Sequence, residues 1–151
     1  MDDITARQLL ALTADVMIVI GRMKRFARVS EPGSINPGTE FAILDTILRH
    51  GCKTVPEIAN FRGVTRQSVQ NLVNKMIEMK TIGYADNPSH KSSRYLRVKA
   101  GGLNLHKSAE AQMLNRYMEY KNQLQPDDVA AAARVMSVIA EVWNQTDLEM
   151  A

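Results

Sequence analysis

The fold is decided by residues 54–75, which read TVPEIANFRGVTRQSVQNLVNK. Thr54 is of a residue type that caps helices, a proline lies in the first turn that follows, and Glu57 stands three positions on, as in a capping box. Gly63 then allows a tight turn, and Thr65 can cap a second helix. The stretch therefore predicts two helices joined by a short turn, which is a helix-turn-helix.

The second of these helices, predicted to run from Thr65 to about Lys80, has a clear apolar stripe and an opposite polar face. In a helix-turn-helix, the N-terminal residues of the second helix contact base edges in the major groove, where Arg suits guanine and where Gln and Asn suit adenine. A solvated surface helix is the alternative, but this polar face is rich in neutral amides rather than in Glu and Lys. The candidate DNA-binding residues of this helix are Thr65, Arg66, Gln67, Ser68, Gln70, Asn71 and Lys75.

After Thr81 the apolar residues follow a strand pattern. Residues 82–84 and 95–98 predict two short strands, and the polar, turn-rich residues 86–93 lie between them. This predicts a β-hairpin with a long tip, whose Lys91 and Arg94 can neutralise DNA phosphates. A plain surface loop is the alternative. Because the hairpin follows the polar helix directly, the two together predict a winged helix.

Outward from this centre, four more helices are predicted, which makes the order four helices, two strands and two helices. They cover Ile4 to about Val29, Thr39 to His50, about Leu103 to Gln123, and Pro126 to the end region of the chain. Thr39 is expected to cap its helix, and Gly51 to end it. The expected fold class is mainly α with a small β-hairpin wing: a winged helix-turn-helix flanked by N- and C-terminal helices.

The outer helices each have an apolar face that the winged helix is too distant to bury completely. Pairing with a second copy would bury these faces, and twofold symmetry is the commonest arrangement of soluble oligomers. A helical bundle within one chain is the alternative. Seven methionines at helical spacing are expected either in the core or around a small-molecule pocket. They are Met17, Met23, Met76, Met79, Met113, Met118 and Met136.

Charge and length set further bounds. The chain has 151 residues and a net charge of +3, which fits one domain with a mild positive charge. Residues 39–99 hold ten Lys or Arg against five Asp or Glu, so the positive charge lies in the middle of the chain. Such a block favours a polyanionic partner, although a solvated basic surface would have the same composition. We expect no membrane-spanning segment and no secretory signal.

Catalytic and metal-binding patterns are absent from the sequence. It has no Gly-rich phosphate loop, nucleophile elbow or metalloprotease helix motif, so no catalytic residue, cofactor or metal is predicted. His50, His90, His106 and Cys52 lack a zinc-ligand spacing. A single cysteine forms no internal disulfide and fits a reducing cytosol. The neighbouring Lys53 and the helix start favour a thiolate and hence redox sensing, but a lone Cys near a helix junction is usually a small buried apolar residue, and this second interpretation is preferred.

The residues from Thr39 to Gly102 resemble the winged helix of the MarR family of transcription regulators. The resemblance rests on residues 41–51, on 54–59 and on 63–73, which include the run Gly-Val-Thr-Arg-Gln-Ser-Val-Gln, and on the wing at residues 87–94. Two features depart from the family. The common wing pattern of Asp, one residue, Arg and Asp is missing, and Val98-Lys99 replaces the Leu-Thr pair that usually precedes the fifth helix.

The resemblance implies a bacterial, cytoplasmic homodimer that pairs through its first and last two helices and binds a near-palindromic operator in double-stranded DNA. Many members of the family are repressors released by small aromatic ligands. Carried over to this chain, the wing role falls on His90, Lys91 and Arg94. The expected organisation is one MarR-like unit over residues 1–151, with a DNA-binding lobe at 39–102 and dimerisation helices at 1–30 and 103–147. A winged-helix module that binds another protein and no DNA is the alternative.

Overall fold

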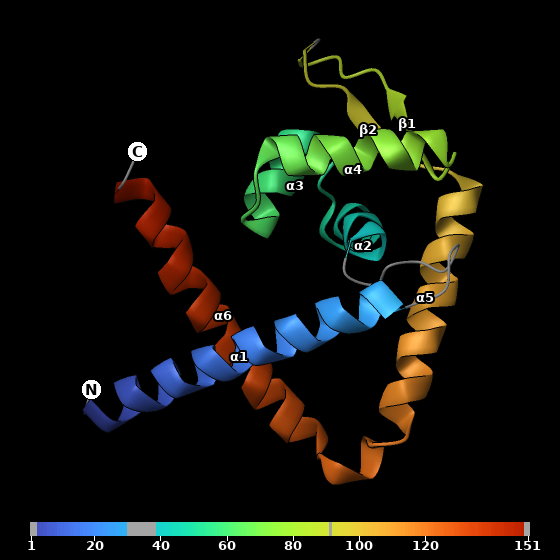
Figure 1. Ribbon diagram of the computed structural model, residues 1–151. Helices are drawn as coiled ribbons and strands as arrows, with labels where there is room; N and C mark the ends of the chain where they lie inside the picture. Colours follow the sequence, from blue (N-terminus) through green and yellow to red (C-terminus); the bar gives the residue numbers. More distant parts are fainter. Residues whose placement is uncertain (1–2, 30–38, 91, 150–151) are drawn as a thin grey trace. The chain divides into compact units, whose positions relative to one another are not determined.

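The computed structural model describes residues 3–29, 39–90 and 92–149, and the order of its elements is the predicted one, with a short 3-10 helix added (Figure 1). The mainly helical fold class with a hairpin wing is confirmed. The elements are α1 (Asp3–Val29), α2 (Glu40–His50), α3 (Val55–Arg62), α4 (Arg66–Glu78), β1 (Ile82–Ala85), β2 (Tyr95–Val98), α5 (Ala100–Met118), the 3-10 helix η1 (Lys121–Gln123) and α6 (Pro126–Glu149).

The chain divides into two compact units. Residues Arg25–Met113 form the winged-helix unit, and Met1–Lys24 together with Leu114–Ala151 form the helical unit. The hydrophobic core lies in the winged-helix unit, where α2, α3 and α4 pack together with the hairpin (Figure 1). Its buried members come from all five of these elements and are Ile43, Leu44, Ile58, Ala59, Val69, Val73, Met76, Ile82 and Leu96.

The capping residues explain where the helices of the winged-helix unit begin. Thr54 and Glu57 form the predicted capping box, since the Thr54 hydroxyl accepts from the Glu57 N–H and the Glu57 carboxylate accepts from the Thr54 N–H. Thr65 caps α4 by accepting from the N–H of Ser68 at 3.1 Å. The predicted cap at Thr39 is wrong, because its hydroxyl donates to the neighbouring Glu40 carboxylate instead of accepting from the helix backbone.

Glycines end two of these helices and bring a third close to its neighbour. Gly51 and Gly63 follow α2 and α3 with φ of 71° and 60°, a conformation that costs glycine little. α5 starts at Ala100, three residues earlier than predicted, so residues 100–102 form its first turn. Gly102 is buried there, where a Cβ would collide with the Thr81 carbonyl oxygen.

The hairpin is antiparallel and is joined to the helix-turn-helix by its backbone. Ile82 pairs with Val98 and Tyr84 with Leu96, which places Ile82 and Leu96 on the core side. The Leu96 N–H also donates to the Lys53 carbonyl at 2.6 Å, just before α3 begins. The hairpin is therefore anchored both through its side chains and through the segment that precedes α3.

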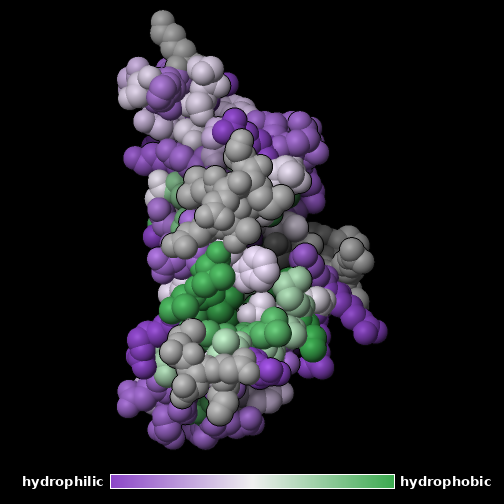
Figure 2. Space-filling view, turned by 90° about the vertical axis from the view of Figure 1, so that its left-hand side faces the viewer, coloured by the Kyte–Doolittle hydropathy of each residue, from purple (hydrophilic) through white to green (hydrophobic). Residues whose placement is uncertain are grey.

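In the helical unit, none of the described side chains is fully buried, and large apolar side chains are exposed along α1, the end of α5, and α6. Figure 2 views the molecule from the side of the free ends of α1 and α6 and shows a patch of apolar side chains on this face, between the areas drawn in grey. Of the seven methionines, only Met76 lies in the buried core, while Met17, Met23, Met79, Met118 and Met136 are exposed. Of the two predicted placements of the methionines, the core is therefore wrong for most of them.

Candidate nucleic-acid interface

The first half of α4 presents its polar residues to solvent because Val69, Val73 and Met76 turn the opposite side into the core. The side chains of the predicted contact residues Thr65, Arg66, Gln67, Ser68, Asn71 and Lys75 are exposed, and Gln70 is half-buried. The backbone N–H groups at this helix start and the exposed Arg66 favour anionic groups. The structure thus places Thr65, Arg66, Gln67, Ser68, Gln70 and Asn71 in the accessible first half of the helix, whereas Lys75 lies in its last turn.

The amide side chains of α4 are ordered by one another. Gln67 Nε2 donates to Asn71 Oδ1 at 2.8 Å, and Gln70 Nε2 donates to Asn74 Oδ1, also at 2.8 Å. Both bonds join residues four apart, which lie on the same side of a helix. Fixed amides lose less side-chain entropy on binding a base edge than mobile ones would.

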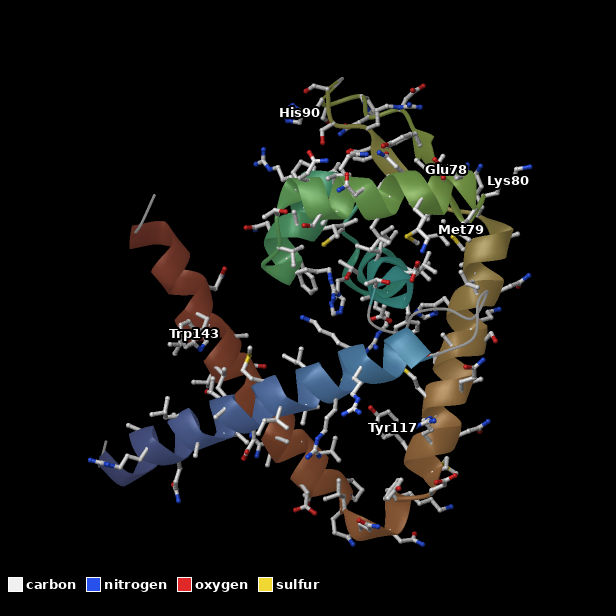
Figure 3. All side chains as sticks on the ribbon, in the orientation of Figure 1. Glu78, Met79, Lys80, His90, Tyr117 and Trp143 are labelled. Carbon is white, nitrogen blue, oxygen red and sulfur yellow. The ribbon has the colours of Figure 1, made fainter. Side chains whose placement is uncertain are left out.

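The tip of the hairpin is held by Asn87, whose side chain is buried. Its Oδ1 accepts from the N–H groups of Ser89 and His90, and its Nδ2 donates to the Ser93 carbonyl oxygen at 2.7 Å. His90 is exposed near this tip (Figure 3). The turn-rich composition of residues 86–93 predicted a turn, but the sequence did not identify Asn87 as the residue that organises it. The predicted wing residue Lys91 lies outside the described residues.

A groove of about 370 Å³ lies between α4 and the hairpin, with the start of α3 beside it. Arg66, Gln67 and Gln70 line it from α4, and Arg94 lines it from the hairpin. The guanidinium carbon of Arg94 stands 4.4 Å from the centre of the Tyr84 ring, so the aromatic face holds this cation in place. Two arginines on either side of one groove make it suitable for a phosphodiester backbone.

Lys75 differs from the other predicted residues because its ammonium is paired with another helix. Its Nζ lies 2.7 Å from Oε1 of Glu40, whose side chain is only 7% exposed. Burial acts to raise the pKa of Glu40, but hydrogen bonds from Lys75 and Thr39 outweigh it, so the pKa lies below its usual value. The pair links the first turn of α2 to α4. Contact of Lys75 with DNA remains a prediction.

A second polar cluster, which the sequence did not reveal, joins α5 to α2 within the winged-helix unit. His106 is nearly buried, with its Nε2 at 3.1 Å from Asp45 Oδ1 and its ring stacked on Phe41 at 4.7 Å between centroids. Arg49 lies 3.6 Å from the same carboxylate oxygen. His106 and Asp45 are 61 positions apart in the sequence, so only the folded chain brings them together.

Cys52 packs against the core as a small apolar residue would. Burial raises the pKa of its thiol, and the negative charge of Glu57 raises it further. A raised pKa keeps the sulfur protonated and unreactive at neutral pH. The structure therefore favours the packing interpretation of Cys52 over the redox-sensing one.

The described part of the chain has neither a metal-binding cluster nor a membrane-spanning helix. Residues 3–29, 39–90 and 92–149 contain no group of three or more His, Cys, Asp or Glu side chains placed to hold a metal ion. Over the same residues, every helix is too short or too polar to cross a lipid bilayer.

The fold and this surface are those of a winged-helix protein, and part of the chain is similar to the MarR family. Residues 37–91 match the model of the MarR family, a range that covers α2, α3, α4 and β1 but ends before β2. No curated protein matches the sequence. The predicted resemblance to the MarR family is thus confirmed over these residues.

Solved structures extend the likeness of fold to nearly the whole chain. NMB1585, a MarR family regulator from Neisseria meningitidis, has a TM-score of 0.69 at 14% identity, over 95% of this chain and 99% of that one. FabT of Streptococcus pneumoniae in complex with DNA has a TM-score of 0.64 at 14% identity, over 94% and 99%. Bordetella bronchiseptica BpsR, whose DNA binding is regulated by 6-hydroxynicotinic acid, has a TM-score of 0.63 at 11% identity, over 90% and 98%.

Proposed function

We propose that this protein is a dimeric transcription regulator that binds a specific site in double-stranded DNA. The observation that carries the proposal is the surface formed by the exposed start of α4 and the hairpin, with Arg66 and Arg94 on either side of one groove. FabT, which has the same fold, was solved in complex with DNA. By this proposal, α4 enters the major groove and the hairpin lies against the adjacent backbone or minor groove.

The residues of this surface are proposed to have different roles, according to the chemistry of their side chains. Arg66 reads a guanine or binds phosphate, the amides of Gln67 and Asn71 read base edges, and the hydroxyls of Thr65 and Ser68 bind phosphate. The two hydroxyl groups lie 2.7 Å apart, so they form one polar site at the start of the helix. On the hairpin, Arg94, His90 and Lys91 supply contacts to phosphate.

The helical unit supports the dimer. Leu10 of α1 is 72% exposed and Trp143 of α6 is 61% exposed, together with many apolar neighbours. Soluble monomers rarely leave a contiguous apolar surface of this kind in water. A second copy of the chain is the occupant we propose, because twofold pairing would also present two α4 helices to a palindromic operator.

We further propose that the protein represses transcription and that a small aromatic ligand releases it from its operator. BpsR supports the ligand, since a pyridine carboxylic acid regulates its DNA binding and its fold is shared over 90% of this chain. The expected place of action is a bacterial cytoplasm. An effector acts only through a difference in affinity between DNA-competent and incompetent states, so it is expected to weaken operator binding without contacting DNA.

The test is selection of bound sequences from a pool of random duplex DNA at near-physiological salt. We expect a palindrome with half-sites about one helical turn apart. Its affinity should fall steeply as salt rises, because bound arginines and lysines release counterions from the backbone. A folded dimer that enriches no sequence would overturn the proposal and favour the protein-interaction module.

A further inference from the structure

Tyr84 lies where the hairpin meets α4, and it contacts one groove-lining residue of α4 and one of the hairpin. Its hydroxyl accepts a hydrogen bond from Gln70 Nε2 at 2.9 Å, and its ring lies under the Arg94 guanidinium at 4.4 Å. The side chain is 36% exposed and lines the groove rather than filling the core. From the sequence, Tyr84 was predicted only as a strand residue, because nothing in its spacing shows which helix it faces.

The hydrogen bond to Tyr84 limits which hydrogen-bonding groups of Gln70 are free to bind a base. A glutamine amide has two N–H donors and one carbonyl oxygen. Gln70 Nε2 donates both to Tyr84 and to Asn74 Oδ1, so both donors are used within the protein. Only Oε1 remains for a ligand, and it can accept from the amino group of adenine or of cytosine. The two-bond pairing of glutamine with adenine needs a free donor for N7, and here that donor is taken.

We propose that Tyr84 is a positioning residue that restricts Gln70 to an acceptor and thereby sets the base preference at one position of each half-site. The inference rests on the proposed function, because it concerns how the same surface reads DNA. With Tyr84 in place, an adenine and a cytosine at this position each receive one hydrogen bond from Gln70. Without the hydroxyl, one N–H of Gln70 is free to reach adenine N7.

Tyr84→Phe tests the inference, because it removes the hydroxyl and keeps the ring under Arg94. Binding selections with the wild type, Tyr84→Phe and Gln70→Ala are compared, each variant first being shown to unfold at the wild-type temperature. Gln70→Ala identifies the base pair that Gln70 reads, since preference there should disappear. At that base pair we expect Tyr84→Phe to raise the ratio of adenine to cytosine about fivefold, the usual worth of one hydrogen bond. Other positions should keep their preferences.

Tyr95→Phe is the matched control, because it removes a hydroxyl from the neighbouring strand, where the ring faces Lys53 instead of α4. Its selected sequences should equal those of the wild type. Tyr84→Leu removes the ring as well. It should repeat the shift toward adenine and also lower the slope of log affinity against log salt by about one, as Arg94 loses its support.

Each outcome separates the inference from the function on which it rests. An unchanged ratio at the base pair of Gln70 in both Tyr84 variants overturns the inference and leaves the regulator intact. So does a Gln70→Ala variant that selects the wild-type site, because Gln70 would then read no base. A wild type that enriches no sequence overturns the proposed function and the inference together. A shift toward adenine confined to that base pair, and absent from Tyr95→Phe, supports it.

Discussion

At the scale of single residues, the side chains that α4 exposes are proposed to bind DNA and are expected to contribute little to stability. Arg66 is exposed at the start of the helix and lines the groove with Arg94. Ordinary surface substitutions change stability by about 0.5 kcal/mol or less. Binding and folding can therefore be separated at this position by one substitution.

We expect Arg66→Ala to weaken specific DNA binding by about 1–3 kcal/mol and to leave the unfolding temperature nearly unchanged. The reason is the loss of a cation at the groove, without loss of any buried contact. Equilibrium binding to the selected operator and thermal unfolding of the free protein are the two measurements. A variant that unfolds early yet binds with wild-type affinity would show that Arg66 has a structural role instead.

Gly102, in the first turn of α5, is expected to affect stability instead of binding, because it is buried and closely packed. We expect Gly102→Ala to destabilise the protein by about 1–3 kcal/mol, since the new methyl group would collide with the Thr81 carbonyl oxygen. Gly101→Ala is the control, because its Cβ would stand at an ordinary 3.6 Å from the Lys80 carbonyl oxygen. That variant should be neutral or slightly more stable. Chemical denaturation of both variants measures their free energies of unfolding, and equal values would contradict the packing argument.

At the scale of elements, α3 and the hairpin are positioned by the segment around Lys53. The Lys53 carbonyl binds the hairpin, and its N–H donates to the Glu57 carboxylate at 2.6 Å. Glu57 thus caps α3 and holds the segment that anchors β2. The hydrogen bond from the Lys53 backbone is the largest cause of the lowered pKa of Glu57.

This lowered pKa predicts an acid-sensitive contribution of Glu57 to stability. A carboxyl whose pKa is lower in the folded state stabilises the protein above its unfolded pKa, and this stabilisation is lost as pH falls through the folded pKa. We expect Glu57→Gln, which keeps a capping-box residue, to be less stable by under about 1 kcal/mol at neutral pH. It should also lose less stability than the wild type between about pH 5 and pH 3.

Denaturation at a series of pH values measures this difference. Glu110→Gln, at an exposed position of α5, is the control for removal of one carboxylate. It should follow the wild-type dependence on pH. If Glu57→Gln and the wild type lost equal stability on acidification, the capping interaction would not be the source of the effect.

At the scale of the whole molecule, the apolar surface of α1 and α6 is the feature on which we base the proposed dimer. The winged-helix unit has its own buried core, while the described side chains of the helical unit include none that is fully buried. The helical unit therefore gains more from association than the winged-helix unit does. Operator affinity should depend on the dimer, because two half-sites are bound together.

We expect Leu10→Glu to shift the protein toward a monomer of 16.9 kDa and to weaken binding to a palindromic operator at least tenfold. A charge buried at the apolar interface without a partner is the cause. Light scattering after size exclusion and operator titration are the measurements. Gln8→Glu is the matched control, because it adds the same charge on nearly the opposite side of α1. A Leu10→Glu variant that stays dimeric would place the interface elsewhere.

The sequence by itself determined the order of the elements and the identity of the winged helix. The capping box at Thr54 and Glu57, the turn at Gly63 and the polar start of α4 are local features, formed by residues within a few positions of one another. Local hydrogen bonds and helical periodicity depend on spacing along the chain, so spacing predicts them. The likeness to the MarR family, carried by this same stretch, was confirmed over residues 37–91.

Only the tertiary structure decided the contacts between distant residues. The bond from Gln70 to Tyr84 spans 14 positions, the pair of Lys75 and Glu40 spans 35, and the pair of His106 and Asp45 spans 61. No periodicity relates such residues, because their approach depends on how the helices and the hairpin pack around the core. The sequence therefore identified which side chains α4 presents, whereas packing decided which of their hydrogen-bonding groups remain free to bind.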